Sequence, residues 1–257
     1  MAPAPDPTVE AARPCILITR PEPGASALAD RLRAAGAQAL VSPLMELRAL
    51  PAEIRAEGAA AVVLTSANGA RCAPEGAALR ALGCWCVGEA TAEAALAAGF
   101  RDVRAGASDA AALAARMLAD ARLRPGDRVI HLRGVHGTDG FAEALEAEGV
   151  RVDAAAVYEM AEVGGLTAAA AEALRAGRVA VAPVYSPRSA RLLAEALTAQ
   201  APGAASALKA AAISPAAAAP LRRLGLAELS ICAAPDGAAM EGSTLALAGL
   251  GGPGTRG

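Results

Sequence analysis

The chain has 257 residues, 54% hydrophobic and only 2% aromatic, with a formal net charge of -2 at pH 7. This charge argues against the clustered basic face that nucleic-acid binding requires. Five cysteines without a CxxC pair favour neither a disulfide framework nor a metal site. Residues 1–13 carry no apolar run, and no window of about 18 uncharged apolar residues occurs elsewhere. We therefore expect a cytoplasmic protein that contacts neither membranes nor nucleic acids.

Short buried strands alternate with helices along most of the chain. Residues 15–18 form the first predicted strand, a helix follows over 24–35, and the next strand covers 37–41. Further strands are predicted at 60–64, 84–87, 102–105, 128–132, 150–153, 179–185, 209–213 and 228–232. Helices are expected near 67–81, 89–98, 109–121, 139–148 and 167–176. Strands alternating with helices of this length are typical of a parallel, doubly wound α/β sheet.

One stretch of the chain occurs twice. The segments AVVLTSANGAR at 61–71 and VAPVYSPRSAR at 181–191 each begin as a strand, reach a Ser and continue as a helix. Downstream, CWCVGEATA at 84–92 corresponds to AAAISPAAA at 210–218. Two copies are too few for a solenoid, so the duplication predicts two similar α/β domains that face each other across a cleft.

Residues 154–163 break the alternation because they are extended and no capping residue leads them into a helix. We interpret them as one arm of a linker whose other arm is 44–50. Pairing of the arms makes the first domain discontinuous, with residues 14–43 plus 164–250, and inserts the second domain at 51–153. The remaining segments are predicted to be disordered tails, at 1–13 and 251–257.

Polar turns follow several of the predicted strands. Ser186-Pro187 and Ser214-Pro215 each combine a helix N-cap with proline at the first helical position, and Thr65-Ser66 and Gly88 hold the equivalent places in the other half. Because the carboxyl ends of parallel strands share one edge, the free N–H groups of several helices would face one crevice. The predicted ligand is an anion with several carboxylates or phosphates; ordinary βα turns without a ligand are the alternative.

No strong catalytic constellation is present. The GxSxG elbow, the Walker A loop and the GxGxxG fingerprint are all absent. His131 lies in a predicted strand and is best interpreted as a core residue, whereas His136 lies in a Gly-rich loop. Two histidines without carboxylates at ligand spacing do not predict a metal site. Tyr158 and Tyr185 are each compatible with a place in the core or in a site.

Six short motifs occur in the order LITRP, LTSANGAR, VGEATA, LRG, VYE and YSPRSA. With this order and spacing, the chain resembles the uroporphyrinogen-III synthase family over about residues 14–248. The resemblance implies two α/β domains joined by a two-stranded antiparallel linker, with the active site in the cleft. It also implies a lyase without metal or cofactor, which closes the polycarboxylate hydroxymethylbilane to uroporphyrinogen III with loss of water and inversion of ring D.

The resemblance implies a catalytic role for Tyr158, whose phenol would donate a hydrogen bond to the departing hydroxyl. The rim of turns and the resemblance together suggest a set of substrate-binding residues, namely Thr19, Arg20, Thr65, Ser66, Gly88, Thr91, Arg133, Gly134, Ser186 and Ser214. The expected partners are hydroxymethylbilane and, transiently, hydroxymethylbilane synthase, and the expected state is a monomer.

Three turns depart from the family pattern. Residues 135–138 read Val-His-Gly-Thr where further basic residues are usual, Ala216-Ala217 replace hydroxyl residues, and Asp236 places an acid near the expected carboxylates. The first two departures motivate an alternative, a non-catalytic synthase-like module that binds a tetrapyrrole or another polyanion. A third interpretation, an unrelated two-domain solute-binding protein, is disfavoured because the sequence shows no signal peptide.

Overall fold

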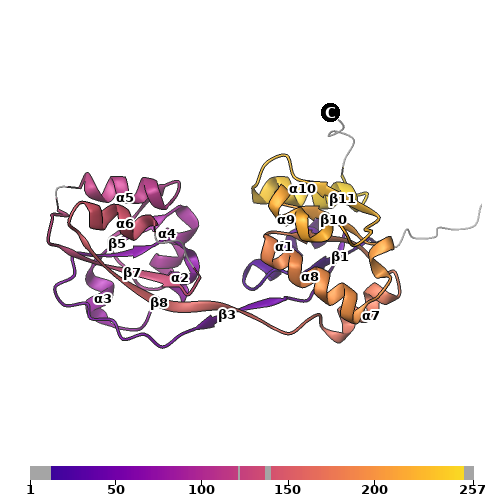
Figure 1. Cartoon of the computed structure of the whole chain (residues 1–257), viewed down its shortest axis with the longest axis horizontal. Coiled ribbons are helices and arrows are strands. Elements are labelled where there is room, and N and C mark those ends of the chain that lie inside the picture. The colour runs from indigo at the N-terminus through magenta and orange to yellow at the C-terminus, as the bar shows by residue number, and fades with distance from the viewer. Residues whose placement is uncertain (1–12, 121, 137–139, 252–257) are drawn as a thin grey trace, which may run out of the picture. The chain divides into compact units, whose positions relative to one another are not determined.

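The computed structural model describes residues 13–120, 122–136 and 140–251 (Figure 1). The chain divides into two compact units: unit 1 comprises Met1–Glu46 and Glu162–Gly257, and unit 2 comprises Leu47–Ala161. Of the predicted tails, only Arg13 and Gly251 lie within the described residues. The predicted helix start at 139 and the loop residues 137–138 lie outside them.

Unit 1 contains a five-stranded sheet in the order β11-β10-β9-β1-β2, in which neighbouring strands run parallel. Most residues of the central strands are buried, which is expected when helices cover both faces of a parallel sheet. The strands are β1 (Cys15–Ile18), β2 (Gln38–Val41), β9 (Val179–Val184), β10 (Lys209–Ala212) and β11 (Glu228–Ile231).

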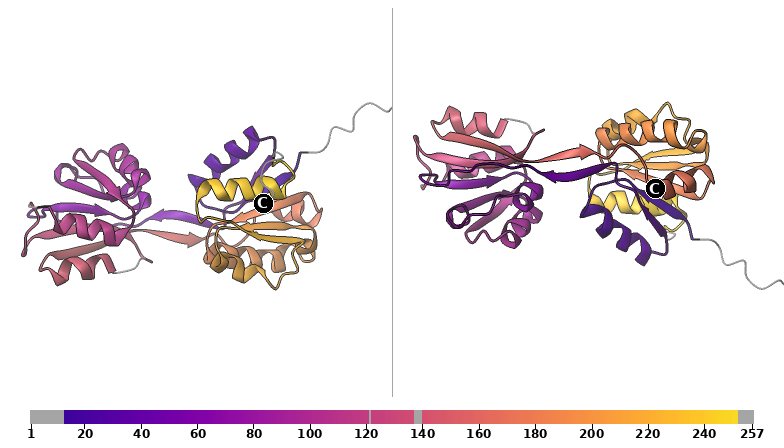
Figure 2. Two further views of the ribbon diagram at one scale, coloured as in Figure 1. Left: turned by 90° about the horizontal axis from the view of Figure 1, so that it is seen from above. Right: turned by 90° about the horizontal axis from the view of Figure 1, so that it is seen from below.

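The helices of unit 1 cover the two faces of its sheet (Figure 2). Helices α1 (Gly24–Ala34) and α10 (Gly237–Leu247) lie on one face, and α8 (Pro187–Gln200) lies on the other. Leu28 of α1 packs with Ile16 of β1 in a fully buried cluster. The remaining helical segments are α7 (Ala168–Arg175), α9 (Pro215–Ala218) and the 3-10 turns η1 (Ala204–Ala207) and η2 (Ala219–Leu221).

Unit 2 contains a six-stranded sheet in the order β3-β8-β7-β4-β5-β6. The strands from β8 to β6 run parallel to their neighbours. The strands of unit 2 are β3 (Met45–Ala49), β4 (Ala61–Leu64), β5 (Gly83–Val87), β6 (Val103–Ala107), β7 (Arg128–Gly134) and β8 (Arg151–Glu162). The predicted α/β class with parallel sheets is therefore confirmed.

Two apolar clusters hold the helices of unit 2 against opposite faces of the sheet. One contains Leu64, Phe100 and residues of α2, α3 and α4, and the other contains Met117, Phe141 and residues of α5 and α6. The helices are α2 (Ala67–Arg71), α3 (Ala77–Ala81), α4 (Glu89–Ala97), α5 (Ala110–Leu118) and α6 (Gly140–Ala147).

The single helix predicted near 67–81 is wrong, because the structure has two short helices there. Helix α2 ends at Arg71, and α3 begins only at Ala77. Pro74 lies between them; it lacks a backbone N–H and disfavours the helical conformation of the residue before it. The interruption leaves α2 as a short helix that directly follows β4.

The boundary predicted between a strand at 150–153 and a linker arm at 154–163 is also absent. Both segments form one continuous strand, β8, which lies next to β3. The N–H of Leu50 donates to the carbonyl of Val157 at 2.9 Å, and that of Val163 donates to Leu44 at 3.2 Å. Residue numbers rise along one segment as they fall along the other, so this pairing is antiparallel. The chain passes between the two units within these paired strands.

The two sheets follow the same plan. In unit 2 the order β8-β7-β4-β5-β6 corresponds to β2-β1-β9-β10-β11 in unit 1. The sequence repeat pairs β4 with β9 and β5 with β10, which agrees with this correspondence. The chain order differs, because β1 and β2 precede the rest of unit 1 whereas β7 and β8 end unit 2.

Candidate functional site

Each sheet has a switch point, which is the place between two neighbouring strands where the strand order reverses. Ligands of open α/β sheets bind beyond the carboxyl ends of the strands at such points. In unit 2 the point lies between β4 and β7, since β5 and β6 extend to one side of β4 and β7 and β8 to the other. In unit 1 the corresponding point lies between β9 and β1. The turns that follow these four strands are therefore the candidate functional regions of the two units.

The turn after β4 contains Thr65 and Ser66. The Oγ of Ser66 accepts the backbone N–H of Asn68 at 3.2 Å and caps helix α2. The Oγ1 of Thr65 lies 3.1 Å from Nε2 of His131, whose ring is edge-on to Phe141 at 5.1 Å. His131 is only 3% exposed, which confirms its interpretation as a core residue. This pair fixes the start of the turn to strand β7.

Tyr158, Arg133 and Gly134 come together on neighbouring strands. Gly134 of β7 pairs with Tyr158 of β8, and the N–H of Val135 donates to the carbonyl of Tyr158 at 3.0 Å. A Cβ atom on Gly134 would lie 2.8 Å from two carbons of the Tyr158 ring, so the ring lies directly over this glycine. The Tyr158 side chain is half-buried and packs at the margin of the cluster beneath α2.

The turn after β5 places Gly88 at the same edge and buries Thr91. Gly88 has a φ of 71°, a conformation that favours glycine, and it precedes the first residue of α4. A Cβ there would meet no atom within 4 Å, so the space beside it is open. Thr91 is 6% exposed, and its side chain faces the interior of unit 2. Of the two residues, Gly88 is the one in position to contact a ligand.

The turn after β9 in unit 1 is held by a reciprocal capping pair. The Oγ of Ser186 accepts the N–H of Ser189 at 3.1 Å, and the Oγ of Ser189 accepts the N–H of Ser186 at 3.1 Å. Pro187 occupies the first helical position, as the Ser-Pro pair predicted. These contacts orient the first turn of α8 and its N–H groups.

Two arginines of helix α8, which the sequence analysis did not single out, converge on one carboxylate. Arg191 donates to Oε1 of Glu162 at 2.8 Å, and Arg188 contacts the same atom at 3.3 Å. The hydrogen bond from Arg191 is the main reason why the pKa of Glu162 is lowered. The signal was the spacing of the two arginines in YSPRSAR, which puts both side chains near the start of one helix face.

Thr19 and Arg20 follow β1 at the switch point of unit 1. The guanidinium carbon of Arg20 lies 4.4 Å from the centre of the Tyr185 ring. Burial raises the pKa of Tyr185, and the nearby guanidinium of Arg20 opposes this effect. Thr19 is 1% exposed, and its hydroxyl has no hydrogen-bond partner among the described residues. Arg20 is thus accessible at this edge, whereas Thr19 is buried beneath it.

Ser214 and Asp236 cap the two remaining helices at the carboxyl edge of unit 1. The Oγ of Ser214 accepts the N–H of Ala217 at 3.3 Å, and Pro215 begins α9. Oδ1 of Asp236 accepts the N–H of Ala239 at 2.8 Å at the start of α10. The acid that departs from the family pattern therefore has a structural role as a helix cap.

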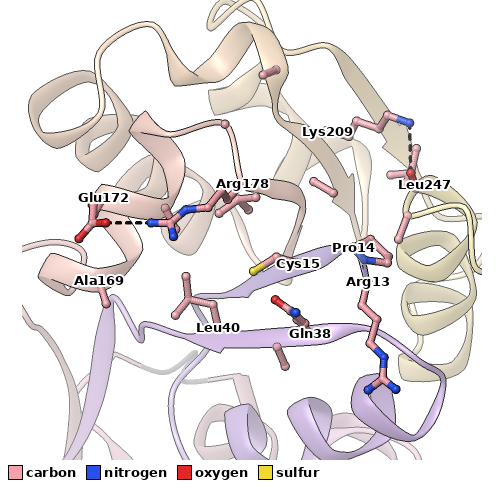
Figure 3. Close-up of a pocket in the computed structure, with 17 residues that line it drawn as sticks. Arg13, Pro14, Cys15, Gln38, Leu40, Ala169, Glu172, Arg178, Lys209 and Leu247 are labelled. Atoms are coloured by element: carbon pink, nitrogen blue, oxygen red, sulfur yellow. Dashed lines mark hydrogen bonds and ion pairs between the residues drawn. The ribbon is translucent and has the colours of Figure 1, made fainter. Parts of the chain in front are cut away.

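A pocket of about 980 Å³ lies at the opposite, amino-terminal edge of the unit 1 sheet (Figure 3). Two of its cations already have partners: Arg178 pairs with Glu172 at 2.9 Å, and Nζ of Lys209 donates to the carbonyl of Leu247 at 3.1 Å. The half-buried thiol of Cys15 also lines it, with a pKa that burial raises. None of the predicted site residues lines this pocket, so it is not the candidate functional site.

The described residues contain no cluster of three or more His, Cys, Asp or Glu side chains suited to a metal ion. Within the same residues, every helix is too short or too polar to cross a membrane. The chemical groups found at the two switch points are hydroxyls, guanidinium groups, backbone N–H groups and the half-buried phenols of Tyr158 and Tyr185.

Comparison with known proteins identifies the family of the chain. The family model described as uroporphyrinogen-III synthase HemD matches residues 26–241. The chain belongs to the uroporphyrinogen-III synthase family. This family consists of cyclising lyases of haem biosynthesis, and the chain is accordingly an enzyme of that class. The match covers every predicted site residue except Thr19 and Arg20.

The solved structure of one uroporphyrinogen-III synthase shares this fold. The Helicobacter pylori enzyme aligns with a TM-score of 0.61 at 18% identity, over 91% of this chain and 99% of that chain. A mutant of the Thermus thermophilus synthase aligns at 17% identity over 84% of this chain and 92% of that chain, with a TM-score of 0.45. No curated protein matches the chain.

Proposed function

We propose that hydroxymethylbilane binds along the carboxyl edge of the unit 2 sheet and that Tyr158 assists the loss of its terminal hydroxyl. The observation that carries this proposal is the place of the Tyr158 ring. It lies over Gly134 at the end of β7, at the switch point where α/β sheets bind ligands. The family membership supports the choice of substrate, and the position of the ring supports the choice of residue.

Loss of the terminal hydroxyl needs only a weak acid catalyst. The electron pair of the pyrrole nitrogen expels the hydroxyl, which leaves as water when a proton reaches the departing oxygen. A phenol can donate a hydrogen bond to that oxygen, and general acids contribute on the order of 10²–10⁴ in rate. The substituted α-carbon of ring D then attacks the methylene carbon that lost the hydroxyl, which gives a spiro intermediate. The bond from this ring D carbon to the bridge carbon toward ring C breaks, the bridge carbon bonds to the other α-carbon of ring D, and that α-carbon loses its proton.

The main role of the enzyme is to orient the substrate so that ring D is inverted, because the bilane closes without inversion when no enzyme is present. An enzyme that holds the chain in one conformation converts the closure into a well-oriented intramolecular reaction. We propose that the backbone N–H groups at the start of α4 and the guanidinium group of Arg133 bind carboxylates of the substrate. Helix N-termini favour anions for this purpose.

Further parts of the proposal concern the protein as a whole. We propose that the two units correspond to the two predicted domains, with the paired segments at 44–50 and 154–163 as linker arms. We also propose a cytoplasmic monomer that receives its unstable substrate in transient contact with hydroxymethylbilane synthase. Light scattering and co-sedimentation with that enzyme test the last two points.

The decisive experiment is an isomer analysis. Hydroxymethylbilane is generated in situ, this protein is added, and the oxidised products are separated by chromatography. We expect the type III isomer to dominate, whereas the uncatalysed reaction gives type I. If folded protein yields only type I, the assignment to an active synthase fails.

A non-catalytic module that binds a tetrapyrrole is the second candidate, and the altered turns favour it. Ala217 offers no hydroxyl at the start of α9, and its N–H is occupied by Ser214. Asp236 adds a carboxylate near the same edge. A tetrapyrrole titration of protein that yields only type I product would identify this function. The presence of Tyr158 at the switch point of unit 2 favours the enzyme.

A further inference from the structure

The strand that carries Tyr158 contains one residue more than its partner. Along β7 and β8, Arg133 pairs with Ala156, but the next residue, Gly134, pairs with Tyr158. Val157 is therefore the extra residue of a β-bulge, which inserts one residue into one strand and turns the side chains that follow it. Bulges are frequent next to active sites for this reason.

The bulge changes the face on which Tyr158 lies. Ala155 and Val157 pack into the cluster on the α2 side of the sheet, and strict alternation would put Tyr158 on the opposite face. Tyr158 packs against the same cluster instead. The sulfur of Met160, two residues further, lies 3.8 Å from Nδ2 of Asn68 in α2. The alternation thus resumes on the α2 side after the bulge.

Gly134 leaves room for the redirected ring. Ile130 and Leu132 of β7 face the same cluster, so alternation directs position 134 to the same side. A Cβ at this position would lie 2.8 Å from Cε2 and Cζ of Tyr158 and 3.1 Å from its hydroxyl. Distances of this size exclude any side chain while the ring stays in place. An alanine would push the phenol away from its position.

We infer that Gly134 and the bulge at Val157 form a seat that positions the Tyr158 phenol, so that Gly134 acts through Tyr158. This gives Gly134 the role of a positioning residue and not of a substrate contact. The inference rests on the proposed function for the importance of Tyr158 in turnover. Its structural part, the contact between ring and glycine, can be tested independently of turnover.

The test uses the fact that the chain contains only two tyrosines, Tyr158 and Tyr185. Protein labelled with 3-fluorotyrosine should show two fluorine resonances, which the Tyr158→Phe variant assigns. We expect Gly134→Ala to shift the Tyr158 resonance and leave that of Tyr185 unchanged. The matched control is Gly242→Ala in α10, where a Cβ meets no atom within 4 Å and φ is ordinary. It should shift neither resonance.

Kinetics then test the consequence. We expect Gly134→Ala to lower kcat roughly ten-fold or more, the scale of a lost general acid, with a small change in KM. In the Tyr158→Phe background the same substitution should lower kcat little further, because no hydroxyl remains to be misplaced. An equal loss in both backgrounds, or an unmoved Tyr158 resonance, overturns the inference.

A stability measurement covers the case in which Gly134→Ala folds poorly. If the cause is the contact with the ring, Gly134→Ala combined with Tyr158→Ala should melt at a higher temperature than Gly134→Ala alone. Absence of this rescue also overturns the inference. Full activity of Tyr158→Phe, together with a shifted resonance in Gly134→Ala, would instead refute the proposed role of Tyr158 and leave the seat established.

Discussion

The switch points of the two units follow the same strand plan but end in different side-chain contacts. In unit 1, Tyr185 directly follows β9, and the guanidinium of Arg20 lies over its ring. In unit 2, the corresponding residue after β4 is Thr65, which contacts the buried His131. The tyrosine of unit 2 comes from β8 and lies over Gly134.

This difference shows that a duplicated strand order does not determine the side-chain contacts at the switch points. Ladder positions make Arg133 the counterpart of Arg20, since Leu132 pairs with Leu64 and Ile16 pairs with Val181. The same plan thus supplies an arginine at both points. In unit 1 the guanidinium of Arg20 lies over the ring of Tyr185. In unit 2 Nε of Arg133 donates to the carbonyl of Gly134 at 3.3 Å, and the ring of Tyr158 lies over that glycine. Contacts between distant segments, and not the strand plan, decide where each phenol lies.

The largest expected effect separates the two tyrosines. Tyr158→Phe should lower kcat roughly ten-fold or more while the protein stays folded, because the departing hydroxyl loses its hydrogen-bond donor. Tyr185→Phe is the matched control, and it should leave kcat nearly unchanged since Arg20 covers its ring. Both rates are measured as formation of the type III isomer. Equal losses in the two variants would contradict the difference between the units.

A smaller effect concerns the caps of the equivalent turns. Ser186→Ala removes the bond to the N–H of Ser189 and should cost about 1 kcal/mol of the free energy of unfolding. Ser66→Ala should cost less, because Ser66 makes a single 3.2 Å cap bond whereas Ser186 belongs to a reciprocal pair. Urea denaturation of both variants checks the order. A larger cost for Ser66→Ala would show that the turn of unit 2 depends more on its cap.

The smallest effect is a pH dependence confined to unit 2. Hydrogen bonds from Arg122 lower the pKa of Asp120 to about 2 from its usual 3.8. A carboxyl group whose pKa is lower in the folded than in the unfolded protein stabilises the fold at pH values above its pKa in the unfolded protein. This contribution is lost as the pH falls toward its pKa in the folded protein. Asp120→Asn should therefore flatten the acid dependence of stability between about pH 4 and pH 2.

Trp85, the only tryptophan of the chain, reports on this region. Arg104 lies 4.9 Å from the centre of its ring and pairs with Asp120 at 3.2 Å. The fluorescence of Trp85 should follow the acid titration in the unchanged protein and lose this response in Asp120→Asn. Glu162→Gln in unit 1 is the control and should leave the Trp85 titration as it was. A response that survives Asp120→Asn would assign the titration to another group.

Much of the local structure was predictable because its causes are local. The Ser-Pro pairs at 186–187 and 214–215 predicted helix starts, and the structure confirms both caps. Short apolar runs predicted most strands to within a few residues, but the strand predicted at 150–153 continues to Glu162. The helix near 67–81 was predicted wrongly although Pro74 was visible, because the apolar pattern continued across it. The backbone constraint imposed by Pro74 outweighs the apolar pattern at this place.

The sequence by itself determined the alternating α/β elements, the duplication and, through six motifs in order, the family. These follow from local periodicity, capping chemistry and spacing, which any reader of the chain can evaluate. Only the tertiary structure decided that Thr91 and Thr19 are buried, that Arg20 covers Tyr185, and that a bulge places Tyr158 over Gly134. The physical reason is that strand register and contacts between distant segments depend on how both faces of each sheet are packed.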